Sequence, residues 1–229
     1  MKGKHEIIRL RNITFLYIAI IVSLMGFVIF LFLISPLIGQ FIDIQKDKFY
    51  NISNAKKDFI ELYLTKCIDI AKQIGSCSMM RHELERYNEG KISLKELVDF
   101  TSPKLKDAMI QAKDVKGVAR FSKNNQLLLN IGTHIPEEFF EKGNTNSIWI
   151  SDPFVIDKNY YIVISLPILN RNLQKIGKDM VLFDFSKIKH LINTHSKAFP
   201  QISIGLGSLH NEKPLFFSII QGMKMIPCF

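Results

Sequence analysis

The chain has 229 residues, of which 47% are hydrophobic and 22% are charged, and its formal net charge is +9. This composition excludes a disordered chain and suits a folded protein with some membrane-embedded sequence. The basic residues do not gather into a dense face interleaved with aromatics, so we expect no binding to nucleic acid.

The first predicted element is a transmembrane helix. From Asn12 to Ile42 there is no charged side chain, and about 20 apolar residues suffice to cross the hydrocarbon core. A cleaved signal peptide is the alternative, but its apolar region is shorter and ends at a small-residue cleavage site. Long domains translocate largely regardless of charge, so the short basic tail is the better guide to orientation. It places residues 1–11 in the cytoplasm and the bulk of the chain outside.

A long helix is predicted directly after this anchor. Residues 43–74 contain no Gly or Pro, and apolar residues between Ile60 and Ile74 recur at helical spacing. Gly75 is a plausible stop for the helix.

Shorter helices follow the long one. Residues 78–88 predict a helix that Gly90 closes. Ser93 and Glu96 have the spacing of a capping box, in which each side chain satisfies a backbone amide of the other residue. Pro103 favours the first turn of a further helix.

At Gly117 the hydrophobic period changes from helical to alternating. Residues 117–132 predict two strands joined by a turn at residues 124–125. Further strands are predicted at residues 147–155, 159–169 and 175–185, with a turn at residues 170–172. Helices followed by an antiparallel sheet of about five strands indicate an α+β fold.

This order of elements resembles the double-Cache, PAS-like sensor domains of bacterial membrane receptors. The segments that carry the resemblance are Arg81–Met109, Ile150–Asn170 and Lys175–Ile192. The resemblance implies a ligand-sensing input domain of a sensor histidine kinase, diguanylate cyclase or chemoreceptor. Such a domain would be anchored in the bacterial inner membrane by a single helix, with its folded part outside the cytoplasm.

The resemblance also divides the chain into segments. We expect a tail at 1–11, an anchor at 12–42, a sensor domain at 43–196 and the incomplete start of a second module at 197–229. Receptors of this family continue into a second membrane helix and a cytoplasmic output domain, and no output motif is recognisable here. The chain is therefore expected either to be a truncated receptor or to pass its signal to a partner.

The resemblance implies a pocket between the sheet and the loop and helices that cover it, with a carboxylate or an amino acid as ligand. A guanidinium binds a carboxylate bidentately, and a carboxylate binds an ammonium group. The predicted ligand-binding residues are Arg120, Trp149, Ser151, Asp152, Tyr161 and Asp184. Arg120, Trp149, Asp152 and Tyr161 are expected to converge on one face of the sheet. The ordinary alternatives are that Trp149 and Tyr161 are core aromatics, that Arg120 is a solvated strand end and that Asp152 belongs to a turn.

No enzymatic activity, metal or cofactor is expected. His190 and His195 are five residues apart rather than four, and the three cysteines lack a metal or redox spacing. No nucleophile elbow is present either. The partners expected are a small molecule, the membrane and a second copy bound through the long helix. The alternative to a sensor is an anchored interaction or scaffold protein with a degenerate pocket.

Overall fold

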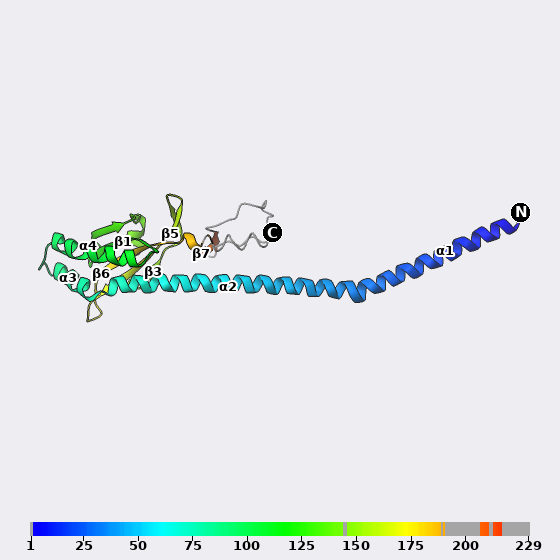
Figure 1. Ribbon diagram of the computed structural model, residues 1–229, viewed down its shortest axis with the longest axis horizontal. Helices are drawn as coiled ribbons and strands as arrows, with labels where there is room; N and C mark the ends of the chain where they lie inside the picture. The colour runs from blue at the N-terminus through cyan, green and yellow to red at the C-terminus, as the bar shows by residue number, and fades with distance from the viewer. Residues whose placement is uncertain (1, 144–145, 189, 191–206, 211–212, 217–229) are drawn as a thin grey trace. The chain divides into compact units, whose positions relative to one another are not determined.

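The computed structural model describes residues 2–143, 146–188, 190, 207–210 and 213–216. The chain forms two compact units, residues 1–58 and residues 59–229. The polypeptide passes from one unit to the other within a single helix (Figure 1).

The first unit is helical and contains the apolar run. Helix α1 spans Lys2–Ile29, a π-helical turn η1 spans Phe30–Ile34, and α2 begins at Ser35. The N–H of Ser35 donates to the carbonyl of Phe30, just ahead of Pro36, which has no N–H to continue the regular ladder. By length and composition alone, one described helix, Arg11–Ser76, is apolar enough to cross a membrane.

The second unit begins with the helices that were predicted. Helix α2 ends at Ser76, one residue beyond the predicted stop, and α3 spans Ser78–Asn88. Helix α4 spans Leu94–Gln111 and opens with the predicted capping box, in which the N–H of Ser93 donates to Glu96 Oε2 at 2.7 Å. The predicted extent of α3 and the predicted start of α4 are therefore confirmed.

The prediction of a separate helix starting at Pro103 is wrong, because Pro103 lies inside α4. Proline removes one backbone hydrogen bond from a helix interior. The buried stripe of Leu97, Thr101 and Leu105 runs through this point at a spacing of four residues. Tertiary packing of that stripe therefore keeps one continuous helix.

The main sheet is antiparallel and has six strands, which confirms the α+β class. Its strands pair in the order β2-β1-β6-β5-β3, and β4 also pairs with β5. They are β1 (Val115–Ser122), β2 (Leu127–Gly132), β3 (Trp149–Ile150), β4 (Phe154–Ile156), β5 (Asn159–Leu169) and β6 (Lys175–Asp184). The predicted strand 147–155 is two short strands, because Pro153 between them cannot donate to the ladder. A second sheet pairs β7 (Gly207–His210) with β8 (Lys213–Phe216).

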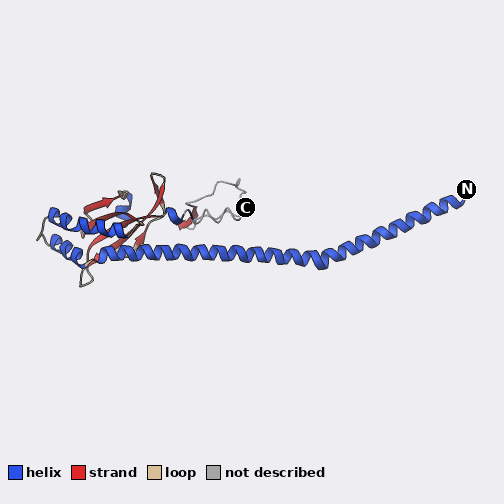
Figure 2. Ribbon diagram, in the orientation of Figure 1, coloured by secondary structure: helices blue, strands red, loops and turns tan. Residues whose placement is uncertain are grey.

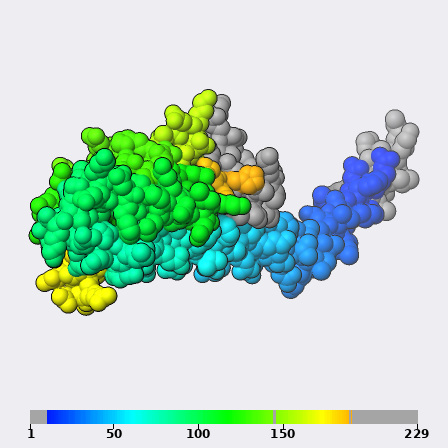
Figure 3. Space-filling view, turned by 60° about the vertical axis from the view of Figure 1, so that its left-hand side comes forward, coloured from blue at the N-terminus to red at the C-terminus, as the bar shows by residue number. Residues whose placement is uncertain are grey.

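The two faces of the main sheet are covered by different layers (Figure 2). Helices α2, α3 and α4 supply side chains to the core on one face, which includes Ala71, Leu105 and Val181. On the other face, the short helix α5 (Glu138–Lys142) packs against β3–β6. The predicted turn after β5 is present, with the Oδ1 of Asn170 accepting two backbone N–H groups, and it protrudes as the yellow segment in Figure 3.

Candidate functional site

Arg120 does not lie on the face that carries Trp149 and Tyr161, so the expected convergence of these residues is wrong. Strand β1 places Val118 in the core under the helices and Ala119 in the core on the opposite face. Alternation along a strand then puts Arg120 on the helix-covered face.

The guanidinium of Arg120 is occupied by Asp179 on the neighbouring strand β6. Its Nε and Nη2 donate to the two carboxylate oxygens at 2.8 and 2.7 Å, and the two side chains are 1% and 0% exposed. Burial disfavours the charged guanidinium, but the facing carboxylate outweighs burial and raises the pKa of Arg120. This side chain is therefore part of the core and not a solvated strand end.

Trp149 and Tyr161 do share one face, and an aromatic layer connects them. The ring of Phe139 lies 6.1 Å from that of Trp149 and 4.6 Å from that of Phe154. Phe154 in turn lies 6.4 Å from Tyr161. We name this cluster, Phe139, Trp149, Phe154 and Tyr161, the aromatic layer.

The other three predicted residues lie around this layer with different roles. The buried hydroxyl of Ser151 accepts the N–H of Val163 at 2.8 Å, so it fixes the edge of the sheet. Asp152 is exposed. The register pairs Asp184 with Tyr161, which puts their side chains on the same face, and the Asp184 carboxylate accepts the N–H of Ser186. Contact of these residues with a ligand stays a prediction.

Sequence reasoning missed Lys178, a buried lysine on the face of the aromatic layer. Its side chain is 1% exposed, its ammonium donates to the carbonyl of Phe140, and it lies 4.5 Å from the ring centre of Phe121. No clear signal in the sequence marks it, because Lys178 stands next to Asp179 and near Lys175 in β6 and reads as part of a solvated strand end. Lys178 is a cation that can meet a ligand carboxylate here.

The pKa of Lys178 leads to a testable pH dependence. Burial, followed by the charge of Lys175, lowers this pKa from 10.5 to about 8. Between these values the unfolded chain holds a proton that the folded chain has lost, so stability should rise with pH. Burial raises the pKa of Cys67 from 9.0 to about 11, which has the opposite effect above pH 9. We therefore expect the melting temperature to rise from pH 8 to pH 9, and Lys178→Met to remove most of that rise.

This prediction is contradicted if the melting temperatures of the wild-type chain and of Lys178→Met rise equally between pH 8 and pH 9. Lys123→Met is the matched control, because Lys123 is exposed in the turn after β1. Its melting temperature should follow pH as that of the wild-type chain does.

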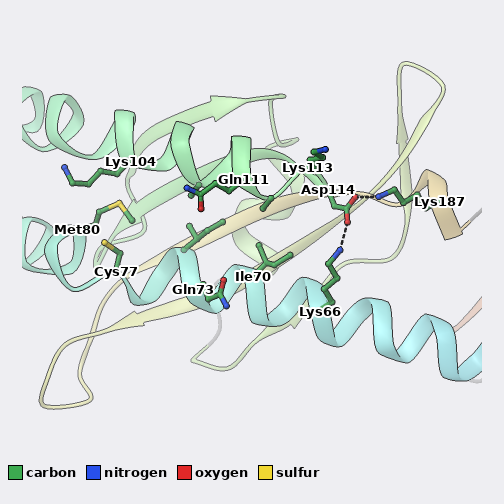
Figure 4. A pocket seen from close by; sticks show the side chains of 13 residues that line it. Lys66, Ile70, Gln73, Cys77, Met80, Lys104, Gln111, Lys113, Asp114 and Lys187 are labelled. Carbon is green, nitrogen blue, oxygen red and sulfur yellow. Dashed lines mark hydrogen bonds and ion pairs between the residues drawn. The ribbon is translucent and has the colours of Figure 1, made fainter.

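A pocket of about 640 Å³ lies on the helix-covered face, between α2 and α4 (Figure 4). Its α2 wall includes Lys66, Ile70, Gln73 and Ile74, which lie at the spacing of one helix face, and Cys77 follows the end of that helix. The remaining lining residues are Met80, Lys104, Ala108, Gln111, Ala112, Lys113, Asp114 and Lys187.

An ion cluster closes one end of this pocket. The ammonium of Lys66 lies 3.0 Å from one oxygen of Asp114, and Lys187 pairs with the other oxygen. Burial of the Asp114 carboxyl would raise its pKa, but the hydrogen bonds from Lys187 and Lys66 reverse this and lower it. Asp114 is thus held ionised, and it ties α2 to the segment that follows β6.

No protein-family model and no curated protein matches the sequence. Among solved structures, the ligand-binding domain of the Campylobacter jejuni chemoreceptor Tlp3 with 4-methylisoleucine is 13% identical, with a TM-score of 0.46 over 62% of this chain and 59% of that chain. The periplasmic sensory domain of C. jejuni Tlp1 is 12% identical, with a TM-score of 0.45 over 66% and 64%. The ligand-binding domain of the Pseudomonas aeruginosa PAO1 amino acid chemoreceptor PctC with GABA is 9% identical, with a TM-score of 0.48 over 73% and 72%.

The chain thus spans about three fifths of the length of the two Campylobacter domains. All three structures are ligand-binding or sensory domains of bacterial chemoreceptors.

Proposed function

We propose that this chain is the membrane-anchored, extracytoplasmic ligand-sensing part of a bacterial signal-transduction receptor. The observation that carries the proposal is the asymmetric cover of the sheet. Three helices cover one face, whereas the other carries the aromatic layer, supplied by a short helix and strands of the sheet, together with the buried cation of Lys178. Ligand sites typically combine such apolar walls with a few polar groups.

The ligand proposed for this face is a small carboxylate or an amino acid. Lys178 supplies the positive charge, because the guanidinium of Arg120 is already paired with the carboxylate of Asp179. Trp149 and Tyr161 supply the apolar wall. Asp184 lies six residues from Lys178 on β6, about 20 Å along the strand, which is too far for it to bind the ammonium group of the same small ligand. The ligand would displace the Phe140 carbonyl as the partner of the Lys178 ammonium.

The ligand proposal is tested by thermal unfolding of the full chain in lipid nanodiscs, with a panel of amino acids and short carboxylates. A ligand at a hundred times its dissociation constant stabilises the folded state by about 2.7 kcal/mol, so at least one compound should raise the melting temperature by several degrees. Trp149→Ala and Lys178→Met should each abolish this shift.

Tyr160→Phe and Tyr161→Phe form a matched pair for the same assay. The two tyrosines are neighbours on β5, and Tyr160 packs against the core under the helices. Tyr161→Phe should reduce the shift, and Tyr160→Phe should leave it unchanged. Equal effects of the two variants would contradict a site at the aromatic layer.

Membrane topology is a separate prediction, based on the charge-free run from Asn12 to Ile42. Alkaline phosphatase fused after Asp184 should be active in bacterial cells, whereas a fusion ahead of Arg9 should be inactive. The reverse pattern would place the aromatic layer in the cytoplasm and overturn the extracytoplasmic assignment.

A second copy is proposed to bind along α2, where Phe59 and Leu62 are exposed.

One observation favours the second candidate, an anchored scaffold with a degenerate pocket. The aromatic layer packs on itself, with the rings of Phe139 and Phe154 at 4.6 Å. If no compound in the panel raises the melting temperature, the scaffold is the better description of this face.

A further inference from the structure

The pocket between α2 and α4 is built from two similar helix faces. On α2, Lys66 is followed by Ile70, Gln73 and Ile74, at four, seven and eight residues. On α4, Lys104 is followed at the same intervals by Ala108 and Gln111, and by Ala112, the residue that caps the helix. The small alanines on α4 stand where larger side chains would fill the space between the helices.

The charge of the pocket lining is strongly positive. Four lysines, Lys66, Lys104, Lys113 and Lys187, face one acidic residue, Asp114. Figure 4 shows three of these lysines around Asp114 at one end and Lys104 at the other. Asp114 neutralises one positive charge, so its end of the pocket retains an excess of two.

The wall between the two charged ends is mainly apolar, with Gln73 and Gln111 as its polar members (Figure 4). Ile70, Ile74, Met80, Ala108 and Ala112 line it. The volume of about 640 Å³ falls within the range of roughly 300–1,000 Å³ found for small-molecule sites. A fully hydrated anion would leave these side chains uncovered, and an uncharged apolar molecule would leave the excess positive charge at the Asp114 end unmatched.

We propose that this pocket is a second binding site, which takes an organic carboxylate with a short aliphatic chain. The carboxylate lies among Lys66, Lys113 and Lys187, and the chain lies along Ile70, Ile74 and the two alanines. This site is on the opposite face of the sheet from the aromatic layer, so it does not depend on the ligand proposed there. It places the carboxylate against α2, the helix that continues into the apolar run.

Hexanoate is the probe, titrated calorimetrically into the full chain in lipid nanodiscs with empty nanodiscs as the blank. We expect saturable binding of one hexanoate per chain at this site. Acetate lacks the chain and 1-hexanol lacks the charge, so both should bind at least tenfold more weakly. Equal binding of 1-hexanol would contradict the role of the lysines, and equal binding of acetate would contradict the role of the apolar wall.

Two charge variants should move the affinity in opposite directions. Lys113→Gln removes one cation and should weaken hexanoate binding about fivefold, the scale of an exposed ion pair. Asp114→Asn removes the carboxylate that competes for Lys66 and Lys187, and should tighten binding several-fold. A variant that merely misfolds cannot bind more tightly, so the second result separates binding from stability.

Lys106→Gln is the matched control on α4, because Lys106 is exposed and outside the pocket lining. It should leave the affinity unchanged. Ala108→Phe fills the pocket and should abolish hexanoate binding, while the melting-temperature shift caused by a ligand of the aromatic layer persists. The proposal is overturned if hexanoate gives no heat above the blank, or if Ala108→Phe binds it as the wild-type chain does.

Discussion

Arg120→Ala should lower the free energy of unfolding by about 3–5 kcal/mol, the usual cost of leaving one partner of a buried ion pair alone. The variant would leave the Asp179 carboxylate, which is 0% exposed, without its bidentate partner. A β-carbon placed on Gly75 would lie 3.6 Å from the same carboxylate, so the end of α2 covers the pair. Urea unfolding of the full chain in detergent micelles measures the loss, with Trp149, the chain's one tryptophan, as the fluorescent probe.

Replacing both partners distinguishes a buried charge from lost packing. Arg120→Met combined with Asp179→Leu removes both charges and keeps apolar volume, so it should recover most of the stability that Arg120→Ala loses. Arg120→Lys is the conservative control, and it should recover only part because lysine cannot form the bidentate pair. A nearly unchanged free energy of unfolding in Arg120→Ala would restore the reading of Arg120 as a solvated strand end.

The local elements were predictable because their signals lie within a few residues of each other. The capping box needs only Ser93 and Glu96, and the β1–β2 turn needs only the polar run around Asn125, which adopts φ 63°. These features fix helix starts and hairpins without reference to the rest of the chain. The α+β class follows from their order.

The face of the sheet to which each side chain points was not predictable for β1. All but one of its residues are buried, so both faces are covered and the polar alternation that marks a solvent face is absent. The sequence around Arg120 is therefore the same whether its side chain binds a ligand or pairs with another residue. Its actual partner, Asp179, is 59 residues away in the chain. The buried Lys178 is hidden for the same reason.

The pocket between α2 and α4 was not predictable because it depends on how two distant helices pack. Each helix face carries its own lysine, glutamine and small or apolar residues, but either stripe alone reads as an ordinary half-buried helix. Asp114 also gave no signal, because both of its lysine partners come from remote segments. A site that several distant elements build together gives no signal within any single segment of the sequence.

Gly177→Ala should destabilise the second unit at least as strongly as Arg120→Ala, by about 4 kcal/mol or more, a size that single substitutions rarely reach. Gly177 lies in β6, opposite Ser122 of β1 and Ile168 of β5. A β-carbon there would lie 2.4 Å from the carbonyl oxygen of Phe121 and 2.9 Å from a methyl group of Leu84. The first contact is with backbone in the adjacent strand, so it cannot be relieved by a side-chain rotation.

The expected result is therefore a loss of the β1–β6 pairing at this position, which would also release α3 from the sheet. Gly39→Ala is the matched control, because a β-carbon on Gly39 in α2 meets nothing within 4 Å, and alanine is favoured over glycine in a helix by up to about 1 kcal/mol. Urea unfolding followed by Trp149 fluorescence should show the control unchanged or slightly more stable. If Gly177→Ala unfolded at the same urea concentration as the wild-type chain, the close approach of α3 and β1 to Gly177 would have to be abandoned. With it would go the packing of α3 on this face of the sheet, and so part of the asymmetric cover on which the proposal of a ligand site at the aromatic layer rests.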